Sequence, residues 1–205
     1  MKNAAAQEKN SDEKLLQSAA AIDAFEGYPN PHSRRLAILS EAVARRFHLA
    51  PPDCLTLQQA ALLHDVGELV MNRDYIRSHQ DLNEEERGDL RRHPVIGEQE
   101  AAKRGFTRGV QLLIRWHHEW WNGAGYPDAL KNEQIPLAAR ILRVVDTYCA
   151  LTDARPFRAA LSEAAAREYL TEWAGIEFDP QVVKHFLDLD RREELKSFQA
   201  DDYVQ

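Results

Sequence analysis

Apolar residues recur at helical spacing along almost the whole chain. Leu36, Leu39 and Val43 fall three or four positions apart, so they share one face of a helix. Residues 110–117 repeat this spacing. Nowhere do apolar and polar residues alternate as they do in a half-buried strand. The chain is therefore predicted to be all-α, with roughly seven to nine helices.

Residues with a known preference for helix ends mark several boundaries. Asn83 stands before three consecutive glutamates, and Asp179 stands before Pro180, as N-cap residues do. Thr107 is placed to begin the helix that follows Gly105. These signals predict helix starts after positions 83, 107 and 179.

The length of 205 residues fits one domain of ordinary size. Residues 1–12 are polar and rich in alanine, and are predicted to form a flexible tail. A helical pattern begins at Glu13, so the folded domain is predicted to span residues 13–190. Residues 191–205 are predicted to form a polar C-terminal tail.

Composition excludes several classes of partner. The formal net charge of −7 argues against DNA as a general partner, although a small anionic substrate needs only a local positive site. No apolar run approaches the length that spans a membrane, and the polar N-terminus is not a signal peptide. Cys54 and Cys149 match no metal or disulfide pattern. We therefore expect a cytoplasmic protein in a reducing compartment.

Ionisable residues stand in apolar surroundings at three places. His64 and Asp65 follow an apolar run, His117 lies on an apolar stripe, and Asp146 is isolated on the apolar segment 141–151. One such histidine is more often a hydrogen-bonded core residue than a ligand. Buried carboxylates are costly unless they are paired or bound to metal, so several in one small domain favour a shared cation. Imidazole and carboxylate ligands together suit Fe, Mn or Zn.

Five motifs occur in an order that resembles a known family. They are HDVGE (64–68), HPVIG (93–97), HHEWWNGAGYP (117–127), IPLAARILRVVDTYCALT (135–152) and RPFR (155–158). The set is similar to the HD-GYP domain, a bacterial branch of the HD phosphohydrolases that degrades cyclic di-GMP. The resemblance runs from about Glu13 to Leu189 and implies an HD-type helical bundle.

This resemblance implies a site for two transition-metal ions, with Fe or Mn expected. Its ligands would be His32, His64, Asp65, His93, His117, His118 and Asp146. Asp65 would bridge the ions, and His64 and Asp65 would form the catalytic core. Tyr28 stands where members with a third metal carry a glutamate, which favours two ions. The remaining histidines are predicted to be surface residues: His48, His79 and His185.

Substrate contacts are implied for the loop that contains Gly123, Gly125 and Tyr126, and for Arg155 and Arg158. The glycines permit backbone conformations that other residues resist, and guanidinium groups suit phosphates. Two other interpretations stay open. The loop could simply cap the site, packed by its tryptophans, and the arginines could be solvated residues at a helix end.

Glu68 and Asn122 depart from the family, which usually has Lys and Asp at these positions, and Phe157 replaces a Tyr. The resemblance implies a metal-dependent phosphodiesterase that converts cyclic di-GMP to pGpG, with GMP as a further product. The departures leave two alternatives. One is a catalytically weak domain that binds the nucleotide or a protein, and the other is a phosphodiesterase for another cyclic dinucleotide. A homodimer and a regulatory partner, such as a diguanylate cyclase or receiver-type protein, remain open.

Overall fold

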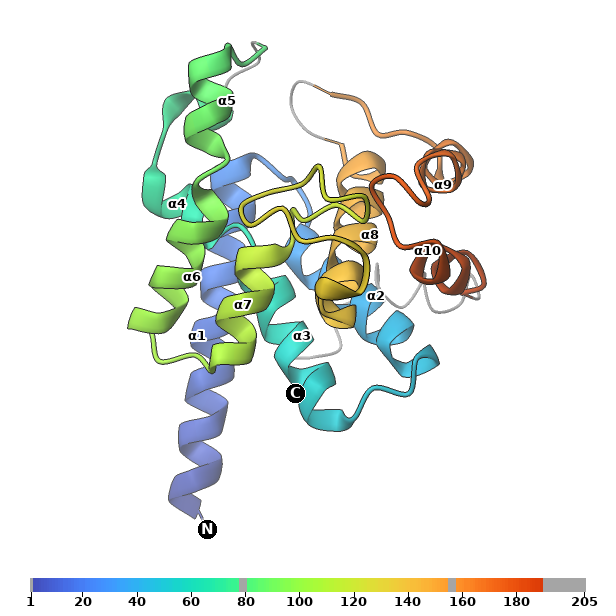
Figure 1. Cartoon of the computed structure of the whole chain (residues 1–205). Coiled ribbons are helices and arrows are strands. Elements are labelled where there is room, and N and C mark those ends of the chain that lie inside the picture. Colours follow the sequence, from blue (N-terminus) through green and yellow to red (C-terminus); the bar gives the residue numbers. More distant parts are fainter. Residues whose placement is uncertain (1, 78–80, 155–157, 190–205) are drawn as a thin grey trace.

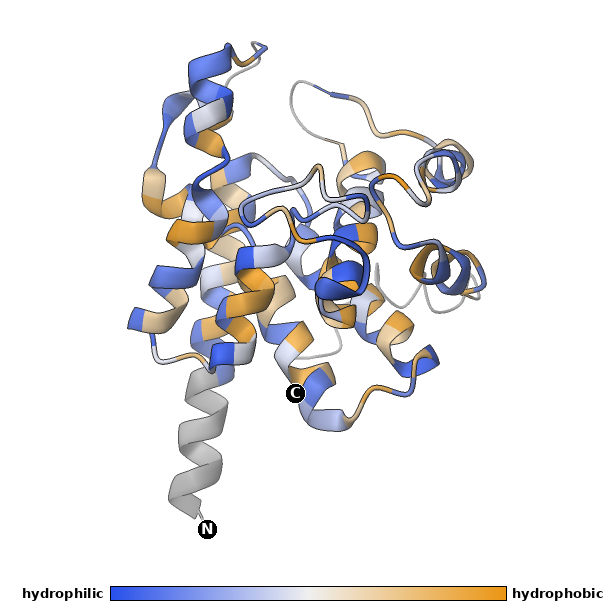
Figure 2. Ribbon diagram, viewed as in Figure 1, coloured by the Kyte–Doolittle hydropathy of each residue, from blue (hydrophilic) through white to orange (hydrophobic). Residues whose placement is uncertain are grey.

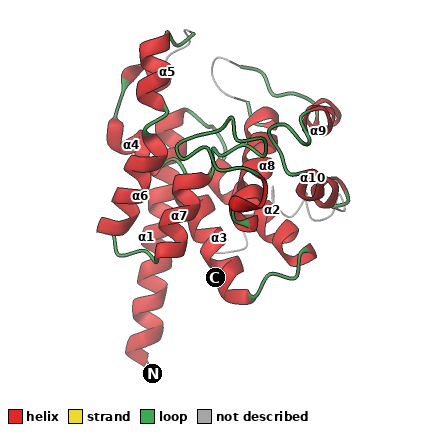
Figure 3. Ribbon diagram, viewed as in Figure 1, coloured by secondary structure: helices red, strands yellow, loops and turns green. Residues whose placement is uncertain are grey.

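The computed structural model describes residues 2–77, 81–154 and 158–189, and these are almost entirely helical (Figures 1 and 3). Within these ranges there is no strand, only an isolated bridge between Ala174 and Phe178. The all-α prediction is confirmed. The elements are α1 (Lys2–Glu26), α2 (His32–Arg46), α3 (Pro51–Leu63), α4 (Val66–Met71), the 3₁₀ helix η1 (Asp74–Arg77), α5 (Glu84–Leu90), α6 (His93–Lys103), α7 (Arg108–Trp116), the 3₁₀ helix η2 (Asn132–Gln134), α8 (Leu137–Thr152), α9 (Glu163–Glu172) and α10 (Pro180–Leu187).

Helix α8 lies at the centre of the bundle. It packs against α2, α3 and α7 on one side and against α9 and α10 on the other (Figure 1). Ile141, Leu142 and Val145 on this helix are fully buried, as are Leu36 and Leu39 on α2. Each buried aliphatic side chain contributes about 1.5–3 kcal/mol relative to an exposed one. In contrast, α5 is hydrophilic along most of its length and buries none of its residues (Figure 2).

The predicted N-caps are confirmed. The side chain of Asn83 accepts a hydrogen bond from the backbone N–H of Glu86 at 2.9 Å, and the Glu86 carboxylate accepts one from the N–H of Asn83. Thr107 accepts a hydrogen bond from the backbone of Val110, and Asp179 accepts one from Gln181 at 2.8 Å. These side chains satisfy N–H groups that a helix leaves without partners in its first turn.

Some boundaries differ from those predicted. Helix α1 begins at Lys2, so residues 2–12, which were predicted to form a flexible tail, are part of this helix. Their flexibility stays a prediction. Helices α4 and α9 were not predicted. His48 is exposed as expected, but His185 is half-buried because its ring packs edge-on against Phe47, with centroids 4.4 Å apart. His79 and residues 191–205 lie outside the described residues.

None of the helices in the described ranges combines the length and the apolar character that crossing a membrane requires.

We expect Asp179→Ala to lower the free energy of unfolding by about 2–4 kcal/mol, since it removes the α10 N-cap and takes the carboxylate partner from a half-buried arginine. Asp179 is buried, and its carboxylate also accepts a hydrogen bond from Arg140 at 2.6 Å. Asp179→Ser keeps a capping oxygen, so its loss should be smaller by about 1 kcal/mol. Urea unfolding of the metal-free protein measures both. Equal losses for the two variants would show that the cap does not stabilise α10.

Candidate metal centre

Helix ends bring the predicted metal ligands to one place. His32 begins α2, His93 begins α6, and His64 and Asp65 form the junction between α3 and α4. His117 is the C-cap of α7, and His118 follows it. Asp146 is different, because it lies within the central helix α8. Six of the seven predicted ligands therefore lie at points where chain direction changes, and the seventh lies on the rigid core helix.

The structure brings all seven side chains together in two adjacent groups. In each group, one potential ligand atom per residue lies within 4.8 Å of all the others. The first group consists of His32, His64 and Asp146. The second group consists of Asp65, His93, His117 and His118.

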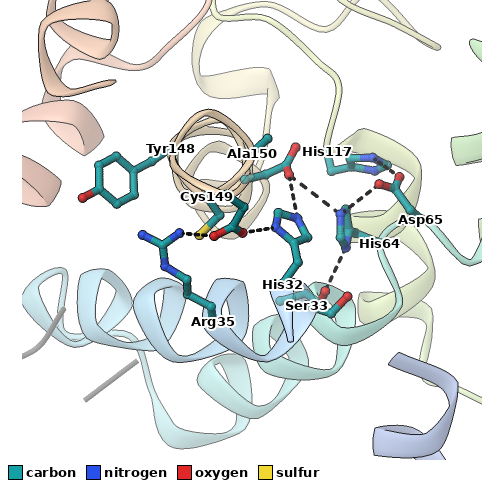
Figure 4. A network of polar contacts seen from close by, with 12 residues as sticks. His32, Ser33, Arg35, His64, Asp65, His117, Tyr148, Cys149 and Ala150 are labelled. Atoms are coloured by element: carbon teal, nitrogen blue, oxygen red, sulfur yellow. Dashed lines mark hydrogen bonds and ion pairs between the residues drawn. The ribbon is translucent and has the colours of Figure 1, made fainter. Parts of the chain in front are cut away.

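Asp65 lies between the two groups and faces both. Its Oδ2 atom is 3.0 Å from Nε2 of His64, in the first group. Its Oδ1 atom is 3.2 Å from Nε2 of His93 and 3.4 Å from Nε2 of His117, in the second. Figure 4 shows this carboxylate between the rings of His64 and His117. A carboxylate with one oxygen toward each group is the arrangement expected of a residue shared by two ions.

Backbone carbonyls fix the orientation of three rings. The Nδ1 atoms of His64, His93 and His117 lie 2.9, 2.8 and 2.6 Å from the carbonyl oxygens of Ala61, Leu90 and Ile114. A carbonyl can only accept a hydrogen bond, so Nδ1 carries the proton and donates it. In the neutral ring, the lone pair is then on Nε2, which points into the cluster.

Lone pairs therefore face one another in a buried space. The Nε2 atoms of His93 and His117 are 3.2 Å apart. Nε2 of His64 and Oδ1 of Asp65 are buried and have no hydrogen-bond partner among the described residues. Buried polar atoms are normally paired, so this set of donors fits a bound cation. Nitrogen and oxygen donors in this combination fit Fe, Mn or Zn.

Without a metal, the histidines divide into two kinds by their pKa. Burial lowers the pKa of His64, but the charge of Asp65 outweighs it and holds the pKa well above the ordinary value. Burial and the neighbouring His117 hold the pKa of His118 well below its usual range. Burial would raise the pKa of Asp65, yet His64 and the other rings hold it well below its ordinary value. Protons on some rings thus take the place of a cation, while His118 stays neutral.

Arg143 is a residue of this site that sequence reasoning missed. Its Nη1 atom is 3.0 Å from Nδ1 of His118 and 3.6 Å from Oδ2 of Asp146. The guanidinium also donates to the buried carboxylate of Glu177, in the turn between α9 and α10. A signal was present in the sequence, since Arg143 is a charged residue on an apolar helix, three positions before Asp146.

The glycine-rich loop lies against the second group. The ring of Tyr126 stacks on His118, with centroids 4.9 Å apart, and the guanidinium carbon of Arg91 lies 5.4 Å from its centre. Gly123 has a φ of +87°, which favours glycine. A Cβ on Gly125 would lie 2.2 Å from the backbone nitrogen of Trp120. The loop therefore brings Tyr126 to the metal groups, while Trp120 packs edge-on against Trp173, so both interpretations of this loop find support.

The departures from the family have different surroundings. Glu68 is buried, with Oε1 3.8 Å from Nδ1 of His93, and it forms a third group with Glu26 and Asp65. Glu68 thus lies beside the metal groups. Asn122 is exposed, and its side chain accepts a hydrogen bond from the N–H of Ala124 at 2.8 Å. Asn122 therefore shapes the turn of the loop.

Of the two predicted phosphate-binding arginines, the structure describes Arg158. Arg158 is exposed, and its guanidinium donates to the backbone carbonyl of Ala150. This contact holds Arg158 against the C-terminal part of α8. Arg155 and Phe157 lie outside the described residues.

The sequence model of the HD domain family matches residues 18–182 of this chain. The chain belongs to the HD domain family. Its curated relatives place this HD domain in the HD-GYP branch, as the motifs predicted. The chain is 34% identical over 182 residues to the cyclic di-GMP phosphodiesterase response regulator RpfG of Xanthomonas campestris. That match covers 88% of this chain and 48% of the relative.

Other relatives carry a different substrate in their names. The chain is 27% identical over 182 residues to the 3'3'-cGAMP-specific phosphodiesterase 2 of Vibrio cholerae, covering 88% of this chain and 35% of that protein. A crystal structure of a cyclic GMP-AMP specific phosphodiesterase from V. cholerae superposes with a TM-score of 0.74 at 22% identity, over 93% of this chain and 51% of that one. This likeness shows the fold alone. The HD domain spans about half the length, or less, of the curated relatives that it matches.

Helix α4 approaches α6 very closely at Gly67, and we expect the metal centre to need this close approach. A Cβ on Gly67 would lie 2.0 Å from the carbonyl oxygen of His93, so Gly67→Ala must separate Asp65 from His93. We expect this variant to lose metal from the second group and to unfold more easily, by about 1–3 kcal/mol.

Gly88→Ala is the matched control, because nothing lies within 4 Å of its Cβ. It should bind metal normally and gain up to about 1 kcal/mol from helix propensity. Metal content by elemental analysis and thermal unfolding measure both effects. Normal metal content in Gly67→Ala would contradict the close approach.

Proposed function

We propose that this HD domain is a metal-dependent phosphodiesterase that hydrolyses cyclic di-GMP to pGpG, with GMP as a further product. The observation that carries the proposal is the pair of buried ligand groups that share Asp65. The curated relatives named as cyclic di-GMP phosphodiesterases support the substrate, at 34% identity.

The residues would divide the work as follows. His32, His64 and Asp146 would hold one ion, with His93, His117 and His118 holding the other and Asp65 bridging both. When bound, two such ions clamp a phosphodiester and make water a nucleophile at neutral pH. Fe or Mn fits these ligands. Tyr28 has no carboxylate with which to hold a third ion, and its ring instead stacks flat on His32 with centroids 4.0 Å apart.

Other residues of the chain would orient and support the site. Arg143 donates to Nδ1 of His118 and to Glu177. This contact leaves the proton of a neutral His118 ring on Nε2, so the ring would have to give up the contact or turn to bind an ion. Tyr126 would contact the nucleotide from its place on the His118 ring, with the Arg91 guanidinium over its own ring. Gly123 and Gly125 let the loop approach closely enough for that contact. A regulatory protein partner, or a second copy of the chain, remains a hypothesis beside the nucleotide substrate.

A second candidate substrate is 3'3'-cGAMP, because several relatives of similar likeness are named for it. A second candidate role is nucleotide binding with weak catalysis. Glu68 favours this role, since it adds a buried carboxylate beside Asp65 where an anionic substrate has to approach.

Anaerobically purified protein should contain about two transition-metal ions per chain and hydrolyse cyclic di-GMP. Turnover of 3'3'-cGAMP measured on the same sample decides between the two substrates. Metal bound without turnover of either would support the binding role, and protein that binds no metal would refute the proposal.

Asp65→Asn should abolish turnover and reduce metal content, because the shared oxygen atoms lose their negative charge. Elemental analysis and a nucleotide assay on the same variant measure both. Loss of turnover at full metal content would contradict a bridging role for Asp65.

Glu68→Gln should raise the affinity for cyclic di-GMP, because it removes a negative charge and keeps a side chain of nearly the same shape. A mismatched charge contact costs about 1–3 kcal/mol, so we expect a gain of about 5- to 150-fold. Calorimetric titration of the nucleotide measures it. Glu100→Gln is the control. It gives the same change in net charge near the C-terminal end of α6, where Glu100 pairs with Arg104, and should leave the affinity unchanged. An unchanged affinity in Glu68→Gln would place this residue away from the phosphates.

A further inference from the structure

His32 differs from the other oriented histidines in what holds its ring. Nδ1 of His32 lies 2.8 Å from Oδ2 of Asp153, a buried carboxylate 121 residues further along the chain. Nε2 of the same ring points the other way, 3.7 Å from Oδ1 of Asp146. Figure 4 shows the ring between these two contacts.

The position of His32 in its helix explains the difference. His64, His93 and His117 each follow a helix end or turn whose carbonyls are available, and each ring uses the carbonyl three residues before it. His32 is the first residue of α2, where a helix presents N–H groups instead of carbonyls. Its Nδ1–H must therefore find an acceptor elsewhere.

Arg35 fixes that acceptor. Its Nη1 atom donates to Oδ1 of Asp153 at 2.6 Å and to Oγ1 of Thr152 at 2.8 Å. Its guanidinium carbon lies 5.4 Å from the centre of the Tyr148 ring. Arg35 and His32 are one turn apart on α2, so the carboxylate binds two neighbours on one helix face. The chain Arg35–Asp153–His32 is buried throughout.

One helix supplies both a ligand and its support. Asp146 lies within α8, and Asp153 is the C-cap of α8. The packing of α2 against α8 thus places the two carboxylates on opposite sides of the His32 ring. A change in that packing would move both contacts together.

We propose that Asp153, held by Arg35, is a positioning residue that keeps the proton of His32 on Nδ1 and presents Nε2 to the metal ion of the first group. The proposal rests on the metal centre proposed above, but not on the identity of the substrate. Outer carboxylates of this kind typically change metal affinity by about 10- to 100-fold when they are removed.

The near-isosteric Asp153→Asn tests it sharply. Arginine can only donate, so the amide oxygen must face Arg35 and the amide N–H must face His32. Nδ1 of His32 then has to accept, and the proton moves to Nε2, where it blocks the metal. We expect one of two Mn²⁺ binding events to weaken by about 10- to 100-fold, with the other unchanged.

Two measurements follow the effect independently of activity. Anaerobic calorimetric titration of the metal-free protein with Mn²⁺ gives both affinities. Nitrogen NMR of the His32 ring in metal-free protein at alkaline pH shows which nitrogen carries the proton, with Nδ1 expected in the parent and Nε2 in Asp153→Asn. A second substitution, Arg35→Met, frees the amide to turn, and should restore part of the affinity and the Nδ1 proton.

Asp179→Asn is the matched control, because it removes the same charge from another buried aspartate that contacts an arginine at 2.6 Å. It should bind Mn²⁺ like the parent. Equal losses in Asp153→Asn and Asp179→Asn, or a proton on Nδ1 in Asp153→Asn, would overturn the positioning role. A parent protein that binds no Mn²⁺ would instead refute the proposed metal centre, whatever the NMR result.

Discussion

The structure depends on a set of nitrogen and oxygen lone pairs that converge in a largely buried space. Nε2 of His93, Nε2 of His117 and the Asp65 carboxylate meet at 3.2–3.4 Å. In a low-dielectric interior these groups repel one another unless a proton or a metal ion lies between them. The helices around the cluster must hold it against that repulsion, and α2 packed on α8 and α4 packed closely on α6 surround it.

Helix ends stabilise this arrangement, because they satisfy backbone groups and orient the side chains with the same contacts. A helix leaves carbonyl groups without partners at its C-terminal end, and His64 and His117 use such carbonyls to orient their rings. The same contact satisfies the carbonyl and directs Nε2 inward. His32 stands at the opposite kind of helix end, which is why its support comes from a side chain on another helix.

Local features of the fold and of the site were predictable from the sequence. Apolar spacing indicated α2 and α7, and capping residues marked the starts of α5 and α10, because these signals act within one or two turns. The resemblance to the HD-GYP family indicated all seven residues that the structure brings together. Three features were not predicted: the roles of Arg143 and Asp153 and the close approach at Gly67. Their partners are His118, His32 and His93, which lie 25, 121 and 26 residues away along the chain, so only folding brings them into contact.

The charge balance of the centre bears on what substrate it can accept. Two carboxylates, Asp65 and Asp146, belong to the two ligand groups, and Glu26 and Glu68 add two more beside Asp65. Two divalent ions would only neutralise these four carboxylates, so little positive charge would remain for an anionic phosphodiester. Arg143 is already engaged by Glu177 and Asp146. Substrate affinity would therefore depend on contacts between the nucleobases and the loop around Tyr126 more than on charge.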